Sequence, residues 1–237
     1  RGQAARGRLR RLCLLRRSLV VRGRFRPDPC LSHVAAWLRH RGGRLAPRRE
    51  MAQRFLHWLD PEAEAFAFRT FSDTCYTRLP GIDPLERELH GSLSACWDEL
   101  AELNRCGAVV AVTINQTNGR GRRVEDIERV RALFLDDDRG IEPDLLALPP
   151  HCRVESSEHH NHYYWLVDGL ETGVYVDALR RLAARYGGDD RVCALNQAMQ
   201  LPGFWRRKRG RPPHIQQVHY QESGGPYNLS GLSGLWQ

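Results

Sequence analysis

Four short segments with the character of β-strands constrain the fold of this chain more than any other feature. They are AVVAVTI (108–114), ALFLD (132–136), CRVES (152–156) and HYYWLVD (162–168). Each has the length and the β-branched or aromatic content of a buried strand. The last three follow one another without a helical pattern that could carry a parallel crossover between them. The sequence therefore predicts an α+β fold with a mixed or antiparallel central sheet.

Amphipathic segments flank these strands and predict the helices of the fold. MAQRFLHWL (51–59), SLSACWDELAELNRCG (92–107) and VYVDALRRLAARYGG (174–188) have helical spacing of their apolar residues, and Gly187 marks the end of the last one. VEDIERVR (124–131) predicts a short helical turn. EAFAFRTF (64–71) and HIQQVHY (214–220) predict a first and a last strand.

Charge divides the chain into a basic segment and a domain. Residues 1–50 hold fifteen Arg against two acidic residues, and the first Met is Met51. We expect residues 1–50 to be a disordered or non-native leader, with the native start at Met51. A basic nucleic-acid-binding arm and a transit-peptide-like leader are the alternatives. Residues 51–220 are expected to form the domain, and the Gly- and Ser-rich 221–237 a flexible, apparently truncated tail.

The cysteines and the hydropathy bear on location. The seven Cys are scattered and form no C-x-x-C pair, which argues against a zinc ribbon or a disulfide framework and fits a reducing cytoplasm. No window approaches the roughly 18 apolar residues of a membrane span. We therefore expect a cytoplasmic protein with no membrane association.

Three consecutive carboxylates, Asp136, Asp137 and Asp138, stand at the end of ALFLD. The period of a strand places Asp136 and Asp138 on one face and Asp137 on the other. Two carboxylates one pleat apart repel each other, and a hard dication such as Mg²⁺ that bridges them removes this cost. A solvated acidic turn is the alternative interpretation.

A second polar cluster, EHHNHYYW (158–165), opens a later strand and places His160 and His162 on one face. It is compatible with a surface histidine cluster that has incidental metal affinity. It is also compatible with a nickase that uses paired histidines and a tyrosine nucleophile, for which Tyr163 and Tyr164 are the nearby candidates.

The order of these motifs resembles a known family. Asp136 and Asp138 in ALFLDDD, His162 in HNHYYW and Asp189 in YGGDDRV follow one another, with the flanks VTINQTNGRGRRVEDIERVRALFLD and MQLPGFWRRK. Over roughly residues 60–220 the chain is similar to the RepB-like primases of plasmids and mobile elements, in the archaeo-eukaryotic primase superfamily. The resemblance implies the RRM-like catalytic core of that superfamily.

The resemblance also implies a reaction and its residues. It implies primer synthesis by nucleotidyl transfer on single-stranded DNA, with nucleoside triphosphates as substrates, and a replicative helicase is a further candidate partner. Asp136, Asp138 and Asp189 are expected to be catalytic and to hold two Mg²⁺ or Mn²⁺ ions. His162 is expected to contact nucleotide phosphates, as a donor or as a local cation. Arg120, Arg123 and Lys208 are further candidate nucleotide-binding residues.

Two departures from the family pattern leave the activity open. Gln197 and Gln200 stand where the family usually has Arg, and Gln carries no charge. Either polymerisation is weakened, or the basic cluster that includes Arg206 and Lys208 compensates. A solvated basic loop is the alternative interpretation of that cluster. A non-catalytic DNA-binding replication module and the His-pair nickase therefore remain alternatives.

Overall fold

The structure, a computed structural model, describes residues 45–73, 83–157, 160–208, 211–221 and 224–235. Most of the predicted leader and parts of the predicted tail fall outside these residues. The helix α3 (Arg49–Leu59) begins two residues before Met51, so the predicted boundary lies inside this helix. The preceding segment also makes contacts, because the backbone N of Arg48 donates to Gly203 O at 2.7 Å and Trp205 Nε1 donates to Ala46 O at 2.9 Å.

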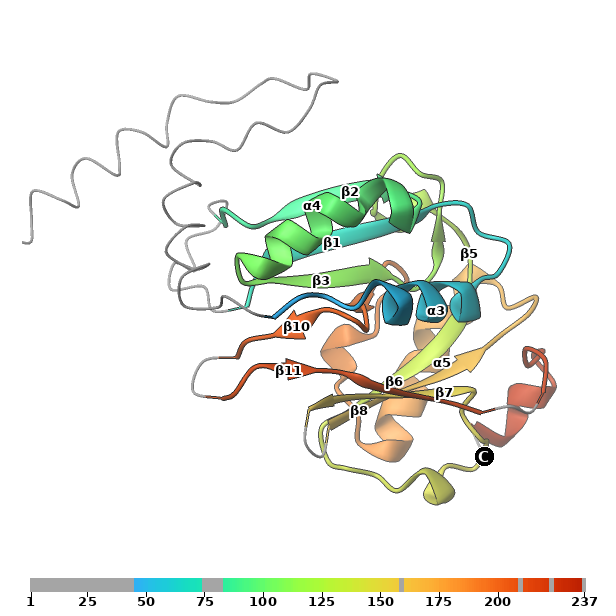
Figure 1. Ribbon diagram of the computed structural model, residues 1–237. Helices are drawn as coiled ribbons and strands as arrows, with labels where there is room; N and C mark the ends of the chain where they lie inside the picture. Colours follow the sequence, from blue (N-terminus) through green and yellow to red (C-terminus); the bar gives the residue numbers. More distant parts are fainter. Residues whose placement is uncertain (1–44, 74–82, 158–159, 209–210, 222–223, 236–237) are drawn as a thin grey trace, which may run out of the picture.

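The first half of the fold is an antiparallel sheet of order β2-β1-β3-β9. Its strands are β1 (Phe66–Ser72), β2 (Arg87–Gly91), β3 (Ala108–Thr113) and β9 (Ala198–Gln200). β3 is AVVAVT and is buried along its whole length, as expected for an inner strand. The helix α4 (Leu93–Arg105) lies across this sheet (Figure 1), and Ser92 caps it by accepting a hydrogen bond from the backbone N of Ala95.

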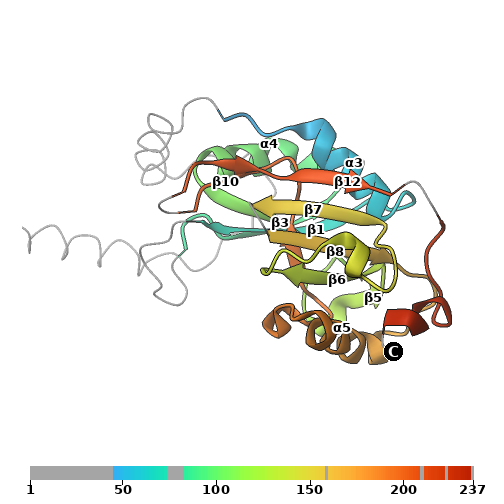
Figure 2. The ribbon, with the colours of Figure 1, turned by 90° about the horizontal axis from the view of Figure 1, so that it is seen from below.

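The second half is an antiparallel sheet of order β12-β7-β8-β6. Its strands are β6 (Ala132–Asp137), β7 (Cys152–Ser157), β8 (His160–Leu166) and β12 (Gln217–Tyr220). The helix α5 (Thr172–Tyr186) runs beside β6 (Figure 2), and Gly187, with φ at 72°, ends it. The predicted α+β class with antiparallel pairing is confirmed, and the strands form two four-stranded sheets.

Short elements complete the described part of the fold. They are the pair β4 (Gln116–Thr117) and β5 (Ile127–Arg129), the hairpin β10 (Trp205–Arg206) and β11 (His214–Ile215), and four 3₁₀ turns: η1 (Val124–Asp126), η2 (Pro143–Leu145), η3 (Asp190–Val192) and η4 (Gly231–Leu235). The helical turn predicted for 124–131 is thus wrong beyond residue 126. Its second part is strand β5, which pairs with β4.

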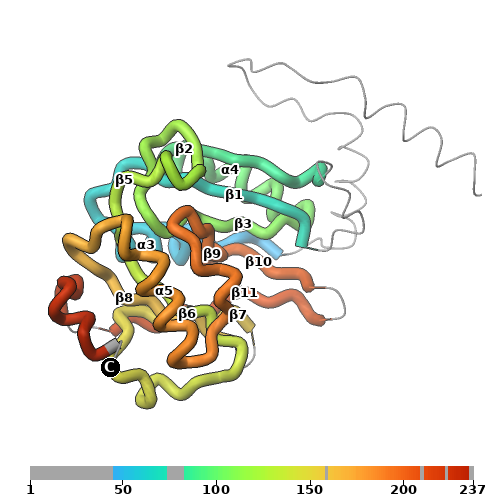
Figure 3. The backbone as a smooth tube through the Cα atoms, turned by 180° about the vertical axis from the view of Figure 1, so that it is seen from behind, coloured from blue at the N-terminus to red at the C-terminus, as the bar shows by residue number. Residues whose placement is uncertain are grey.

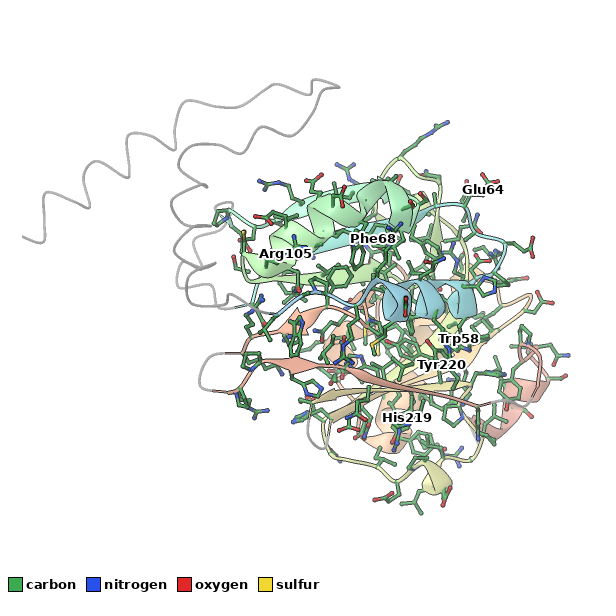
Figure 4. The ribbon with its side chains drawn as sticks, in the orientation of Figure 1. Trp58, Glu64, Phe68, Arg105, His219 and Tyr220 are labelled. Atoms are coloured by element: carbon green, nitrogen blue, oxygen red, sulfur yellow. The ribbon has the colours of Figure 1, made fainter. Side chains whose placement is uncertain are left out.

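α3 joins the two halves into one core. Phe55 and Trp58 of α3 lie against Tyr164 of β8, and Trp58 also lies 5.9 Å from Tyr220 of β12, between ring centroids (Figure 4). At the end of α3, the buried Asp60 accepts from Arg131 Nε at 2.6 Å. Arg129 Nη2 also donates to Asp60, at 2.5 Å, so the carboxylate has two cationic partners. This pairing fixes the end of the helix, because Arg131 without Asp60 would be an uncompensated buried charge. Buried residues of α3 and of both sheets, including Phe68 of β1, belong to one hydrophobic core.

Two further features concern the surroundings of the protein. No helix within the described ranges is long and apolar enough to cross a bilayer. Cys96, Cys106, Cys152 and Cys193, the cysteines that the structure describes, form no disulfide.

Candidate active site

A cleft of about 260 Å³ is lined by residues of both sheets, including residues of β9 and the end of β6. Figure 3 shows the course of the backbone through these two strands. From the second sheet it is lined by Asp136, Asp138, Ser156, His160 and His162. From the first sheet and the segment that follows β9 it is lined by Phe71, Val109, Ala111, Gln197, Ala198, Met199, Gln200, Arg206 and Lys208, with Val192 of η3. The cleft thus has carboxylates and imidazoles on one side and amides and cations on the other.

Strand register brings the two predicted motifs together. Asp136 on β6 is paired with His162 on the neighbouring β8, and its Oδ1 lies 3.4 Å from His162 Nε2. Two residues further on, Asp138 Oδ1 lies 2.6 Å from His160 Nδ1. Each carboxylate therefore faces an imidazole of the neighbouring strand, and both carboxylate–imidazole pairs lie on the same face of the sheet.

Asp137 has a different function from its neighbours. Its side chain is fully buried and accepts hydrogen bonds from the backbone N–H groups of Arg139, Gly140 and Ile141, at 2.9, 3.1 and 2.7 Å. These bonds close the turn after β6 and satisfy backbone donors that would otherwise be unpaired. Asp137 does not line the cleft, in agreement with the predicted alternation.

The two main site residues have shifted pKa values. Burial, together with the nearby carboxylates of Asp138 and Asp189, raises the pKa of Asp136 to about 6. Burial, followed by the charge of Arg206, lowers the pKa of His162 to about 4. His162 is therefore neutral near pH 7. Of the two expected roles, hydrogen-bond donor and local cation, only the donor fits this charge state.

The backbone of Asp189 lies next to Asp136. Its N donates to Asp136 O at 3.2 Å. Gly188 permits this approach, since a Cβ there would lie 2.5 Å from Leu135 Cδ1. The Asp189 carboxylate, however, accepts from Arg191 Nε and Nη2, each at 2.9 Å, and these hydrogen bonds lower its pKa.

The predicted three-carboxylate set is accordingly only partly assembled. Asp136 and Asp138 share the cleft, whereas Asp189 is turned toward Arg191 and does not line it. Across the described part of the chain, no group of three or more His, Cys, Asp or Glu side chains is gathered as a metal ion would require.

The predicted basic residues separate into two groups. Lys208 lines the cleft and is exposed to solvent. Arg120 and Arg123 are exposed residues outside the cleft, and Arg123 lies 3.7 Å from Glu125. Arg122 between them turns inward and donates to Thr113 Oγ1 at 2.8 Å. Of the three nucleotide-binding candidates other than His162, the structure brings only Lys208 to the site.

The tyrosines that motivated a nickase are inaccessible. Tyr163 and Tyr164 are fully buried. Tyr163 Oη donates to Ile141 O at 2.5 Å, and burial raises the pKa of this phenol to about 12. A nucleophile must reach a phosphodiester outside the core, so neither of these two residues can serve.

Comparison with known proteins places this cleft in a family. Residues 101–231 match the RepB DNA-primase N-terminal domain family. The chain belongs to this family. The match includes both motifs and the segment around Asp189, and it confirms the resemblance inferred from their order. The function of the RepB primase domain described here is accordingly primase-like.

Solved structures share the fold of this RepB primase domain. The AEP domain of the cyanophage S-2L primase-polymerase is 17% identical, with 81% of this chain and 100% of that chain covered and a TM-score of 0.60. Primase RepB′ is 19% identical, with 79% and 60% covered and a TM-score of 0.57. The catalytic domain of RepB′ in complex with initiator DNA is 18% identical, with 79% and 92% covered and a TM-score of 0.55. No curated protein matches the sequence.

Proposed function

We propose that this domain synthesises primers on single-stranded DNA by a cation-assisted nucleotidyl transfer, in the replication of a plasmid or another mobile element. The observation that carries the proposal is the convergence of Asp136, Asp138 and His162 in one cleft of a RepB primase domain. Nucleoside triphosphates are the proposed substrates, and a replicative helicase is a proposed partner.

The residues of the cleft fit divalent cations. Asp136 and Asp138 supply carboxylate oxygens, the donors that Mg²⁺ and Mn²⁺ accept. Burial raises the pKa of Asp136, and the carboxylates of Asp138 and Asp189 raise it further. A bound dication would favour the ionised carboxylate and oppose both effects. When bound, Mg²⁺ or Mn²⁺ neutralises the triphosphate and makes the primer 3′-hydroxyl a better nucleophile.

Asp189 is the proposed third ligand, and its pairing does not prevent this role. Arg191, its partner, has a side chain that is 84% exposed. An ion pair to so exposed a cation contributes little to stability. The Asp189 carboxylate can therefore leave Arg191 for a cation at low cost, while its backbone stays bonded to Asp136.

The neutral imidazole of His162 is the proposed donor to the triphosphate. Tyr164 Oη lies 3.5 Å from His162 Nδ1, inside the core. A hydrogen bond from this hydroxyl to Nδ1 would leave the ring proton on Nε2, the nitrogen that faces Asp136 in the cleft. Arg120 and Arg123, outside the cleft, remain candidates for contacts with template phosphates.

The test is a priming reaction with the 237-residue chain, unprimed circular single-stranded DNA, labelled nucleotides and Mn²⁺. We expect short labelled strands that require the triphosphate. Asp136→Asn should abolish them, and the matched change Asp144→Asn, at an exposed site outside the cleft, should not. Equal activity of both variants would contradict the assignment of Asp136.

The same reaction separates the alternatives. A DNA-binding replication module would shift the DNA without making new strands, with or without triphosphate. A nickase would linearise the circle in the absence of nucleotide and remain attached to the DNA. Either result would refute the proposed primer synthesis.

A further inference from the structure

Two side chains in the cleft have buried donors without a partner. Gln200, on β9, is 8% exposed, and its Nε2 has no hydrogen-bond partner. Arg206, on β10, is half-buried and forms an ion pair through Nη2 with Asp73 Oδ1 at 3.2 Å, but its buried Nε has no partner. Both residues line the same cleft as Lys208. A buried N–H group without an acceptor is costly, so such a group commonly bonds a water or a ligand.

The position of these two donors indicates what kind of ligand could accept hydrogen bonds from them. They come from the side of the cleft that the first sheet contributes, and the side opposite is formed by Asp136 and Asp138. A bare carboxylate-type ligand would be repelled by that acidic side. A polyphosphate with divalent cations satisfies both sides, because its oxygens accept from the donors while the cations contact the carboxylates.

We propose that Arg206 and Gln200 form an anion subsite that binds the polyphosphate of the incoming nucleotide. This inference rests on the proposed function and names the residues that recognise the triphosphate. It also explains how the cleft keeps a half-buried cation although Gln stands at both 197 and 200. The charge comes instead from Arg206, on the strand that follows β9.

Arg206 has capacity beyond its ion pair. A guanidinium has five N–H donors in a planar fork, and only Nη2 is used on Asp73. Asp73 is also bound by the backbone N of Arg207 at 2.5 Å. Asp73 thus holds the guanidinium in place and leaves other N–H groups of Arg206 free for a phosphate. Two of these N–H groups could donate to two oxygens of the same phosphate.

The test measures binding, independently of catalysis. Inorganic tripolyphosphate, dATP and deoxyadenosine are titrated into the full chain in the presence of Ca²⁺, and binding is followed by calorimetry. Arg206→Gln should weaken tripolyphosphate and dATP binding about 10- to 100-fold. Gln200→Ala should weaken both by a few-fold. Arg211→Gln, which removes one exposed charge close by in the chain and outside the cleft, should change neither.

Two double variants keep the test decisive if Arg206→Gln destabilises the protein. Arg206→Gln leaves the carboxylate of Asp73 without its cationic partner and could for that reason destabilise the protein. If the melting temperature falls strongly, the double variant Arg206→Gln/Asp73→Asn, which removes this carboxylate charge as well, is titrated instead. Gln200→Arg combined with Arg206→Gln returns one cation to the same cleft. We expect it to restore most of the tripolyphosphate affinity, which a purely structural role of Arg206 would not produce.

Three results would overturn the subsite. They are unchanged tripolyphosphate binding by Arg206→Gln, an equal loss in Arg211→Gln, and an equal loss for deoxyadenosine. If wild-type protein makes primers and Arg206→Gln binds tripolyphosphate normally, the subsite is wrong and the function stands. If wild-type protein binds tripolyphosphate through Arg206 but makes no primers, the subsite stands and the function is wrong.

Discussion

Removing the charge of Asp136 should make the metal-free protein more stable. The pKa of this carboxyl is raised from 3.8 to about 6 in the folded protein. The folded state therefore holds the proton more tightly than the unfolded state does. The stability that this group contributes is complete below pH 3.8 and is lost as the pH rises through 6. Above pH 6 the ionised carboxylate destabilises the fold, and Asp136→Asn removes that destabilisation.

The size of the gain follows from the shift. About two pKa units correspond to about 3 kcal/mol at 1.36 kcal/mol per unit. This is an upper value, because 22% of the side chain is exposed and the 3.4 Å contact with His162 is also altered. For a chain of this size, about 3 kcal/mol corresponds to a rise of roughly 6–12 °C in melting temperature.

The assay is thermal unfolding in EDTA at pH 4, 6 and 8. Asp136→Asn should melt above wild type at pH 8, less so at pH 6, and equally at pH 4. Asp137→Asn is the matched control with the opposite sign, because it weakens three hydrogen bonds to backbone N–H groups and should cost about 1–3 kcal/mol. A gain for Asp136→Asn that is the same at all three pH values would refute the charge-based explanation.

Three further perturbations test other parts of the site and fold. Arg191→Gln should tighten Mn²⁺ binding by up to about fivefold in calorimetry, since it frees Asp189; unchanged affinity would remove Asp189 from the ligand set. Gly188→Ala should destabilise the protein by about 1–3 kcal/mol in chemical denaturation, whereas Gly173→Ala, which meets no neighbour, should not. A chain that starts at residue 51 should melt below one that starts at 45, because it lacks the bonds to residues 203 and 205; equal melting would show that these bonds are dispensable.

Much of the secondary structure could be predicted because local chemistry determines it. β3, β6 and β8 contain apolar runs typical of buried strands, and β7 alternates between buried and partly exposed residues over its first four positions. The ends of α4 and α5 depend on Ser92 and Gly187, whose preferences for cap positions are intrinsic. The turn-forming Asp137 was separated from its neighbours by strand alternation alone.

Elements that depend on distant partners were not predictable in this way. β2 (Arg87–Gly91) has no apolar alternation, and it is a strand because β1 pairs with it at the edge of the sheet. The division into two sheets depends on β9 pairing with β3, which lies some 90 residues earlier in the chain. No periodicity within either segment encodes that pairing.

The same distinction applies to the site. Asp136 and His162 meet because β6 and β8 are adjacent strands, and both positions follow from the motifs. The orientation of the Asp189 carboxylate depends on an exposed side chain, Arg191, whose conformation the sequence does not determine. Arg120 and Arg123 carry the composition of a phosphate-binding loop, but the loop they belong to does not lie at the cleft.

The placement of positive charge shows why a motif departure is weak evidence of inactivity. The resemblance to RepB-like primases leads to the expectation of Arg where Gln200 stands on β9, and a motif comparison alone would predict a weakened activity from this difference. The cleft, however, is defined by three-dimensional position, and Arg206 on β10 reaches it from another strand while Asp73, at the end of β1, anchors it. A charge can therefore move between strands without leaving the site. Whether such a transfer preserves function depends on the donors left free in the cleft, and Arg206 Nε and Gln200 Nε2 are both free in this protein.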